Sequence, residues 1–169
     1  MENIPTRYRP LFLMGEHDIT VDDKSRLLVP AEFRKEISEA RDEKVLICRI
    51  GRKRVPWLYP ENYYRELIAQ RRLSLTPGED EEAFNEAYYS LIFRLQWDGQ
   101  GRVVLPEKLV NRTALKKELT IIGAGDHLVI WNREDWEKRA ATLIDTIDQI
   151  TDREKQATER EKSRIEQND

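Results

Sequence analysis

The chain has 169 residues, of which 39% are hydrophobic and 36% are charged, a composition that suits one or two small globular domains with a heavily charged surface. Its apolar runs fall short of the roughly 20 residues of a membrane-spanning helix, and its start lacks the apolar core of a signal peptide. We therefore expect a cytoplasmic protein without a membrane partner. The single cysteine, Cys48, excludes an internal disulfide and a thiolate metal cluster, and we expect it to be a small buried residue of a strand.

The net charge of −3 is unevenly distributed along the chain. Residues 1–76 carry a surplus of three basic side chains, whereas residues 77–169 carry a surplus of six acidic ones. An acidic chain can still bind nucleic acid when its basic residues gather on one face. The net charge therefore neither indicates nor excludes a nucleic-acid partner.

Residues 1–10 are polar and contain two prolines, which predicts a flexible arm. Periodicity and turn residues predict a first unit over residues 11–72. Within it, a turn at 22–25 separates the first two strands, and Pro30 ends the second because proline cannot donate to a strand ladder. The predicted elements are strands over 17–22 and 27–29, a helix over 31–37, strands over 45–50 and 55–59, and a helix over 61–72.

A connecting helix is predicted within residues 73–92. Pro77 and the glycine after it interrupt the preceding helix, and the acidic run 79–82 then favours a new helix N-terminus through the helix dipole. Three residues give this helix a predicted apolar face: Phe84, Tyr88 and Leu91.

A second unit is predicted over residues 93–140, and a charged C-terminal helix or tail over 141–169. An apolar stripe continues as far as Ile150, and beyond it the mixed charges leave both a solvated helix and a frayed tail open. The predicted elements of the second unit are strands over 93–97, 103–105, 118–122 and 127–131, with a short helix after Pro106 and, after Trp131, a helix that continues along the apolar stripe.

The second unit repeats the first. In each, an Asp is followed four residues later by an Arg, then by three apolar residues and a Pro, and an aromatic ends the last strand in both copies. Such a repeat indicates two copies of one supersecondary unit. The two copies of the motif are Asp22-Asp23-Lys24-Ser25-Arg26-Leu27-Leu28-Val29-Pro30 and Asp98-Gly99-Gln100-Gly101-Arg102-Val103-Val104-Leu105-Pro106.

The Asp-x-x-x-Arg motif allows two interpretations. The arginine could neutralise the aspartate and only pin the hairpin. Alternatively, Arg26 and Arg102 stay exposed and bind phosphates or guanine edges, with Lys24 and Gln100 as second donors two residues earlier. The presence of two copies favours a binding surface, because a repeated polymer can be bound by a repeated donor.

Other chemistry is weakly indicated. The sequence lacks the signatures of zinc proteases, serine hydrolases, P-loops and dinucleotide-binding folds, and His17 and His127 lack metal-ligand spacing. We therefore expect no enzyme activity, no cofactor and no small-molecule substrate. The basic run 52–54 is predicted at an exposed hairpin tip, where phosphate contact and simple solvation are both open. Regularly placed aromatics favour the core or a subunit contact over base stacking: Trp57, Tyr59, Tyr63, Tyr64, Trp131 and Trp136.

The paired motifs resemble those of the MraZ family of bacterial transcriptional regulators, and Leu58-Tyr59-Pro60 and Ile130-Trp131 are similar to the strand ends that follow them. The resemblance spans residues 11–136. It implies an α+β fold in which two tandem swapped-hairpin (AbrB/SpoVT-like) units form one pseudo-symmetric, β-barrel-like core.

The resemblance also implies a function: sequence-specific binding to double-stranded DNA at promoter repeats ahead of division and cell-wall genes, as a repressor that assembles into a ring of identical subunits on the nucleoid. Carried over by position, the DNA contacts and their supports are Arg26, Arg102, Lys24, Gln100, Ser25, Asp22 and Asp98. Ser25 departs from the family's usual glycine, which alters the turn if it requires positive φ. The alternative is an antitoxin-like or scaffold module without specific DNA binding, acting through the charged extension beyond Ile150.

Overall fold

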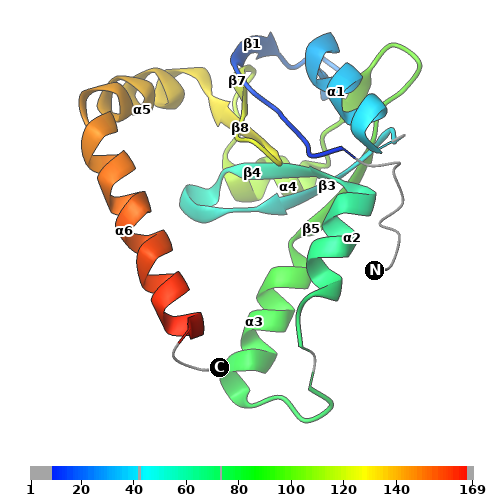
Figure 1. Cartoon of the computed structure of the whole chain (residues 1–169). Coiled ribbons are helices and arrows are strands. Elements are labelled where there is room, and N and C mark those ends of the chain that lie inside the picture. The colour runs from blue at the N-terminus through cyan, green and yellow to red at the C-terminus, as the bar shows by residue number, and fades with distance from the viewer. Residues whose placement is uncertain (1–8, 42, 73, 167–169) are drawn as a thin grey trace. The chain divides into compact units, whose positions relative to one another are not determined.

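The computed structural model describes residues 9–41, 43–72 and 74–166, and its fold is α+β, as the sequence predicts (Figure 1). The chain divides into a compact unit that ends at Arg133 and a second unit that begins at Glu134. The arm predicted over residues 1–10 falls mostly on residues 1–8, which lie outside the described residues.

The first unit contains both repeats, and each repeat has the predicted order of elements. The elements of the first repeat are β1 (Glu16–Thr20), β2 (Arg26–Leu28), α1 (Ala31–Arg41), β3 (Val45–Ile50), the short 3-10 helix η1 (Arg52–Arg54), β4 (Pro56–Pro60) and α2 (Glu61–Ala69). After α3 (Glu79–Ser90), the elements of the second repeat are β5 (Ile92–Gln96), β6 (Arg102–Val104), α4 (Glu107–Thr113), β7 (Glu118–Gly123), β8 (Leu128–Asn132) and the start of α5 (Arg133–Asp145).

Three of these helices begin directly after a proline: Pro30, Pro60 and Pro106. The proline ring fixes φ near the value that a helix needs and removes the N–H that strand pairing would use. Pro60 and Pro106 accordingly have φ of −54° and −59°. Each proline therefore ends a strand segment and directs the chain into a helix.

The strands of the two repeats are exchanged. Among the described residues, six strands form one antiparallel sheet in the order β1-β7-β8-β4-β3-β5. β1 of the first repeat pairs with β7 of the second, and β5 of the second pairs with β3 of the first. The order reads the same from either edge once equivalent strands are matched, so the sheet has a pseudo-two-fold axis between β4 and β8.

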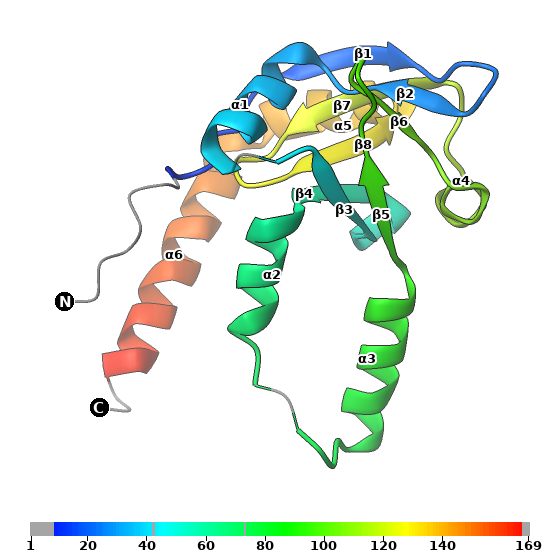
Figure 2. The same ribbon diagram turned by 90° about the vertical axis from the view of Figure 1, so that its right-hand side faces the viewer.

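The remaining two strands, β2 and β6, form a separate antiparallel ribbon (Figure 2). Leu27 lies opposite Val103, and in the large sheet Trp57 lies opposite Val129. In both pairs a residue faces its own counterpart from the other repeat. The pseudo-two-fold axis therefore passes through the ribbon as well as through the sheet.

The predicted barrel-like core is corrected by this topology. In the part of the chain that the structure describes, β1 and β5 are the two free edges of the sheet and no pairing joins them. The exchange of first strands places β1 and β5 at opposite edges, and β2 pairs only with β6. The core therefore lies between one face of an open sheet and the ribbon and short helices that cover this face.

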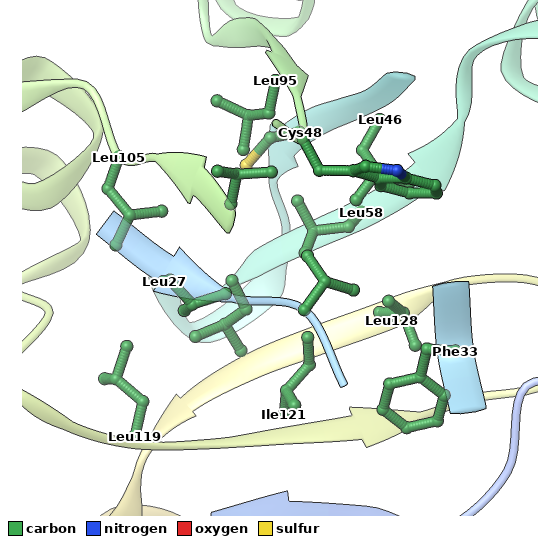
Figure 3. Packing of buried hydrophobic residues seen from close by; sticks show 14 of the residues in the cluster. Leu27, Phe33, Leu46, Cys48, Leu58, Leu95, Leu105, Leu119, Ile121 and Leu128 are labelled. Carbon is green, nitrogen blue, oxygen red and sulfur yellow. The ribbon is translucent and has the colours of Figure 1, made fainter. Parts of the chain in front are cut away.

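One hydrophobic core serves both repeats (Figure 3). Leu27 and Val103 of the ribbon are fully buried, and Phe33 of α1 and Leu109 of α4 occupy equivalent helical positions in the same cluster. Cys48 is fully buried, as predicted, and burial raises the pKa of its thiol to about 12. Each repeat alone would expose this apolar surface, so the two must fold together.

The connecting segment between the repeats is only partly as predicted. The helix α2 ends at Ala69 rather than near residue 72, and α3 follows, both extending from the same side of the sheet (Figures 1 and 2). No residue of α3 is buried, and Phe84 is 48% exposed. The expected apolar face of α3 packs only in part. Tyr88 packs against the cluster of Tyr59 and Tyr64 and accepts a hydrogen bond from the Tyr64 hydroxyl at 2.9 Å, while Phe84 stacks on Tyr88 and lies under Arg71.

The second unit contains most of α5 and all of α6 (Ile147–Glu166). The apolar stripe predicts one continuous helix through Ile150, but the helix is interrupted at Thr146. Beyond Ile150 the chain is helical as far as Glu166, so of the two forms left open by the sequence it takes the helix. Ile144 and Ile147 remain 73% and 55% exposed in the described structure.

Candidate nucleic-acid interface

The first Asp-x-x-x-Arg loop is closed by its aspartate. One carboxylate oxygen of Asp22 accepts hydrogen bonds from the backbone N–H groups of Lys24 and Arg26, each at 2.9 Å. The other oxygen accepts one from Nε of Arg26 at 2.7 Å. A single side chain thus fixes both the turn and the direction of the arginine.

The second loop repeats this geometry. Asp98 accepts hydrogen bonds from the backbone N–H groups of Gln100 at 2.9 Å and Arg102 at 3.0 Å, and from Nε of Arg102 at 3.0 Å. In both copies the aspartate therefore pairs with its arginine and pins the hairpin. This pairing does not contradict the binding interpretation, because the arginine side chains keep 27% and 28% of their surface exposed.

These hydrogen bonds stabilise the ionised carboxylates. They lower the pKa of Asp22 below its usual 3.8, and that of Asp98 to about 2, chiefly because the backbone N–H of the arginine four residues later donates to the carboxylate. Both aspartates are therefore charged near neutral pH.

In the described part of the chain, the terminal nitrogens of Arg26 have no hydrogen-bond acceptor.

The two loops also hold each other. The backbone N–H of Val29 donates to the carbonyl of Gly101, and that of Leu105 donates to the carbonyl of Ser25, at 2.9 and 2.8 Å. These bonds extend the three-residue pairing of β2 with β6 at both ends. The predicted site residues therefore lie together at one ribbon, although they are 76 positions apart in the sequence.

The turns differ at the residue before the arginine. Ser25 has φ of 56° and Gly101 has φ of 81°. Both turns therefore place a residue with positive φ at this position, although the first has serine where the family usually has glycine. The serine adopts this conformation and keeps every backbone hydrogen bond of the glycine turn. A non-glycine residue in this conformation costs on the order of 1 kcal/mol or more, and the backbone hydrogen bonds of the loop are nevertheless unchanged.

Arg34 is a residue that the sequence analysis did not single out. Its Nε donates to the carbonyl of Val29 at 2.9 Å, and its guanidinium lies so close to Gly101 that a Cβ at that position would collide with it. Arg34 follows Pro30 by four residues, and the equivalent position after Pro106 is Val110. Comparing the two helices position by position would have shown this difference.

Basic side chains lie beside both loops, and at the first loop Lys117 forms an ion pair with Asp23 at 3.3 Å. A hollow of about 300 Å³ lies beside Asp98, and its lining includes Arg34, Lys35 and Lys44. Lys24 and Gln100, the predicted second donors, are exposed at the two turns. Donors for an anionic partner are thus present around both loops.

The other candidate residues lie away from the ribbon. The run 52–54 is an exposed tip between β3 and β4, as predicted. Tyr59 and Tyr64 are buried, and His127 stacks on both Trp57 and Tyr59 at ring distances of 4.6 and 4.8 Å. These aromatics pack the junction of the two repeats, which agrees with the core interpretation for Trp57, Tyr59 and Tyr64, whereas Trp131 and Trp136 are only half-buried.

Within the described ranges, no group of three or more His, Cys, Asp or Glu side chains could hold a metal ion. Searching the same ranges, we find no helix with the length and apolar character to cross a membrane. The predicted site residues converge on the ribbon and its two loops.

Comparison with known proteins agrees with this reading of the repeats. The sequence model of the family described as "MraZ protein, putative antitoxin-like" matches residues 12–85 and 93–160. The two segments together cover more than half of the chain, and each contains one Asp-x-x-x-Arg loop. The chain belongs to the MraZ family. The members of this family are transcriptional regulators and not enzymes, as the sequence predicts.

Individual MraZ relatives match over most of their length. The chain is 29% identical over 140 residues to "Transcriptional regulator MraZ" of Heliobacterium modesticaldum, covering 83% of this chain and 94% of the relative. It is 30% identical to that of Moorella thermoacetica over the same shares, and 32% identical to that of Limosilactobacillus reuteri, covering 83% and 95%. The MraZ assignment thus covers both repeats.

Proposed function

We propose that this chain is a transcriptional regulator that binds double-stranded DNA in a sequence-specific way, with Arg26 and Arg102 contacting base edges. The observation that carries the proposal is the convergence of both loops on one exposed ribbon, β2–β6, with one arginine from each repeat. A two-stranded ribbon has a width that the major groove, about 12 Å wide, can admit. The names of the relatives support regulation of transcription.

Asp22 makes Arg26 better suited to bases than to phosphates, whereas Asp98 lies 2.9 Å from a terminal nitrogen, Nη2, of Arg102. The carboxylate of Asp22 neutralises much of the charge of Arg26 and holds its Nε, so the terminal nitrogens can point at an outside acceptor pair. The O6 and N7 atoms of guanine are such a pair. Because the aspartate fixes the side chain in advance, less conformational entropy is lost on binding.

Phosphate contacts would come from the neighbouring donors. Lys24 and Gln100 at the turns, and Lys35 and Lys44 beside the second loop, carry no base-reading geometry but can position the protein on the DNA backbone. Lysine suits this role as a point charge. Ser25 completes the first turn through its backbone.

We further propose, from the family resemblance, that the protein represses a division and cell-wall gene cluster by binding promoter repeats. It would act in the cytoplasm, on the nucleoid, as a ring of identical subunits. Several ribbons in one ring would bind several DNA repeats at once, and this raises the overall affinity far above that of one ribbon. Light scattering of the free protein would give the subunit number.

Substitution of each arginine tests the function. We expect Arg26→Ala and Arg102→Ala each to weaken binding to a duplex selected from a random-sequence pool by about 5- to 150-fold, the effect of losing one bidentate base contact of 1–3 kcal/mol. Arg26→Lys should lose most of the same affinity, since lysine lacks the planar fork. Arg160→Ala, an exposed change on α6, serves as the matched control and should bind normally.

Salt dependence separates base contacts from phosphate contacts. The slope of log affinity against log salt should change less in Arg26→Ala, which loses a base contact, than in Lys24→Gln, which loses a phosphate contact and should reduce the slope by about 1. Fluorescence anisotropy at several salt concentrations measures both. Normal affinity in both arginine variants, with intact oligomers, would contradict the proposal.

The alternative is an antitoxin-like or scaffold function through the charged helix α6. The family description contains the word antitoxin, and α6 is almost entirely exposed within its described residues. Deleting residues 151–169 distinguishes the two functions. The DNA-binding proposal expects unchanged affinity for the selected duplex, whereas the alternative expects no selected duplex in the first place and loss of a protein partner after the deletion.

A further inference from the structure

The outer face of the β2–β6 ribbon carries two exposed apolar side chains. Leu28 is 49% exposed and Val104 is 58% exposed, whereas Leu27 and Val103, their neighbours in the chain, are fully buried. The two exposed residues occupy equivalent positions in the two repeats. An apolar residue repeated at an exposed position next to a candidate binding loop calls for a ligand that it can contact.

The register places each of these residues beside an arginine. Side chains alternate between the two faces of a strand, so Arg26 and Leu28 share the outer face, as do Arg102 and Val104. Across the ribbon, Arg26 pairs with Val104 and Leu28 pairs with Arg102. The outer face is therefore a square of two arginines and two aliphatic side chains, with each arginine next to an aliphatic group in both directions.

We propose that Leu28 and Val104 are specificity-determining residues that contact the C5-methyl groups of thymines in the major groove. This inference rests on the proposed DNA binding by the same ribbon. The major groove offers one apolar group for base recognition, the thymine methyl, next to the O6 and N7 acceptors of guanine. A surface of two arginines and two aliphatic groups is complementary to a site that contains both bases.

The same register limits where the thymines lie. Cross-strand neighbours have Cβ atoms roughly 5 Å apart, which corresponds to one or two base-pair steps of about 3.4 Å. Each thymine contacted by Leu28 or Val104 is therefore adjacent, or next to adjacent, to a guanine contacted by an arginine. Leu28 is larger than Val104, so the two halves of the surface are not equivalent.

A subunit contact is a weaker explanation for this exposed pair. Stable interfaces bury about 800 Å² on each partner around an apolar centre. Here two aliphatic side chains stand among two arginines on a ribbon only three residues long per strand. The donors and the apolar groups alternate, which matches base edges rather than an apolar interface.

The test uses the full chain and a duplex selected from a random-sequence pool. Each thymine of the duplex is replaced in turn by deoxyuridine, which removes only the C5-methyl group. We expect wild-type affinity to fall about 4-fold at one or two positions, as for removal of one buried methyl group worth about 0.8 kcal/mol. Leu28→Ala should lose the response at one position and Val104→Ala at another. Leu75→Ala, at a fully exposed leucine away from the ribbon, is the matched control and should respond like wild type.

Several outcomes would overturn this inference while leaving DNA binding intact. One is arginine-dependent binding in which no deoxyuridine substitution has an effect. Another is a Leu28→Ala variant that responds to each methyl group as wild type does. A third is a change in oligomer size in Leu28→Ala with an unchanged methyl response, which would identify the residue as a subunit contact. Failure of the proposed function would look different, since no duplex would depend on Arg26 and Arg102.

Discussion

The two Asp-x-x-x-Arg loops have the same hydrogen bonds but reach them with different residues. In the second loop Gly101 is buried, and the side chain of Arg34 occupies the space that a Cβ would fill. In the first loop Ser25 is exposed, and Val110 stands at the position equivalent to Arg34. The two loops therefore share their geometry, although glycine at the turn occurs with Arg34 in one case and serine with Val110 in the other. Ser25 has the same left-handed conformation and the same backbone hydrogen bonds as Gly101.

The largest expected effect is on the free energy of unfolding, and it tests whether both loops depend on the same buried residue pair. Leu27 and Val103 lie opposite each other on the pseudo-two-fold axis and are fully buried. We expect Leu27→Ala to lower the free energy of unfolding by about 2–5 kcal/mol, and Val103→Ala by about 2 kcal/mol, since fewer carbon atoms are removed. Urea denaturation followed by tryptophan fluorescence measures both changes.

Leu28→Ala is the control for this pair, because it is one residue away on the outer face. Its effect on stability should stay within about 0.5 kcal/mol. A larger destabilisation by the Leu28 change than by the Leu27 change would mean that the register of the ribbon is shifted by one residue, which would also turn Arg26 inward.

Much of this arrangement follows from the sequence. The Asp and Arg positions, the prolines that end the strands and the order of elements are local signals, and all are found where the repeat predicts them. The charged segment past Ile150 could be read as helix or tail, because charge pairing alone does not choose between them.

The exchange of strands could not be predicted from periodicity and turn residues, whereas the family resemblance implied it through the swapped-hairpin units. Alternating residues indicate that 17–22 and 93–97 are strands, but they do not reveal which strand each one pairs with. The pairing of β1 with β7 is decided by burial of a core common to both repeats. For the same reason the sequence gives no sign that Arg34 covers Gly101, because the two residues are 67 positions apart and belong to different repeats.

An intermediate effect on stability is expected when the glycine of the second turn is replaced by the serine of the first. Gly101→Ser should lower stability by about 1–3 kcal/mol, from the left-handed conformation and from loss of the Arg34 hydrogen bond to Val29. The double variant Gly101→Ser with Arg34→Val copies the Ser25 and Val110 arrangement. The double variant should recover the part of the lost stability that is due to the collision between the serine side chain at position 101 and Arg34.

A double-mutant cycle measures this recovery. With Arg34→Val as the matched single variant, we expect the two changes together to destabilise by about 1 kcal/mol less than their sum. Additive effects would show that Arg34 and Gly101 are independent, and the difference between the loops would then lie in the turn residues alone.

The smallest effect is expected from the reverse change in the first loop. Ser25→Gly relieves the strain of a non-glycine residue at φ of 56°, but glycine also gives the unfolded chain more freedom, which offsets roughly 0.5–1 kcal/mol of that gain. The net change in stability should therefore stay within about 0.5 kcal/mol, and the affinity for the selected duplex should be unchanged, because no side-chain hydrogen bond of Ser25 is present within the described structure. Thermal unfolding and fluorescence anisotropy measure the two quantities. A loss of more than about 1 kcal/mol would contradict the view that only the Gly101 loop is tied to its turn residue.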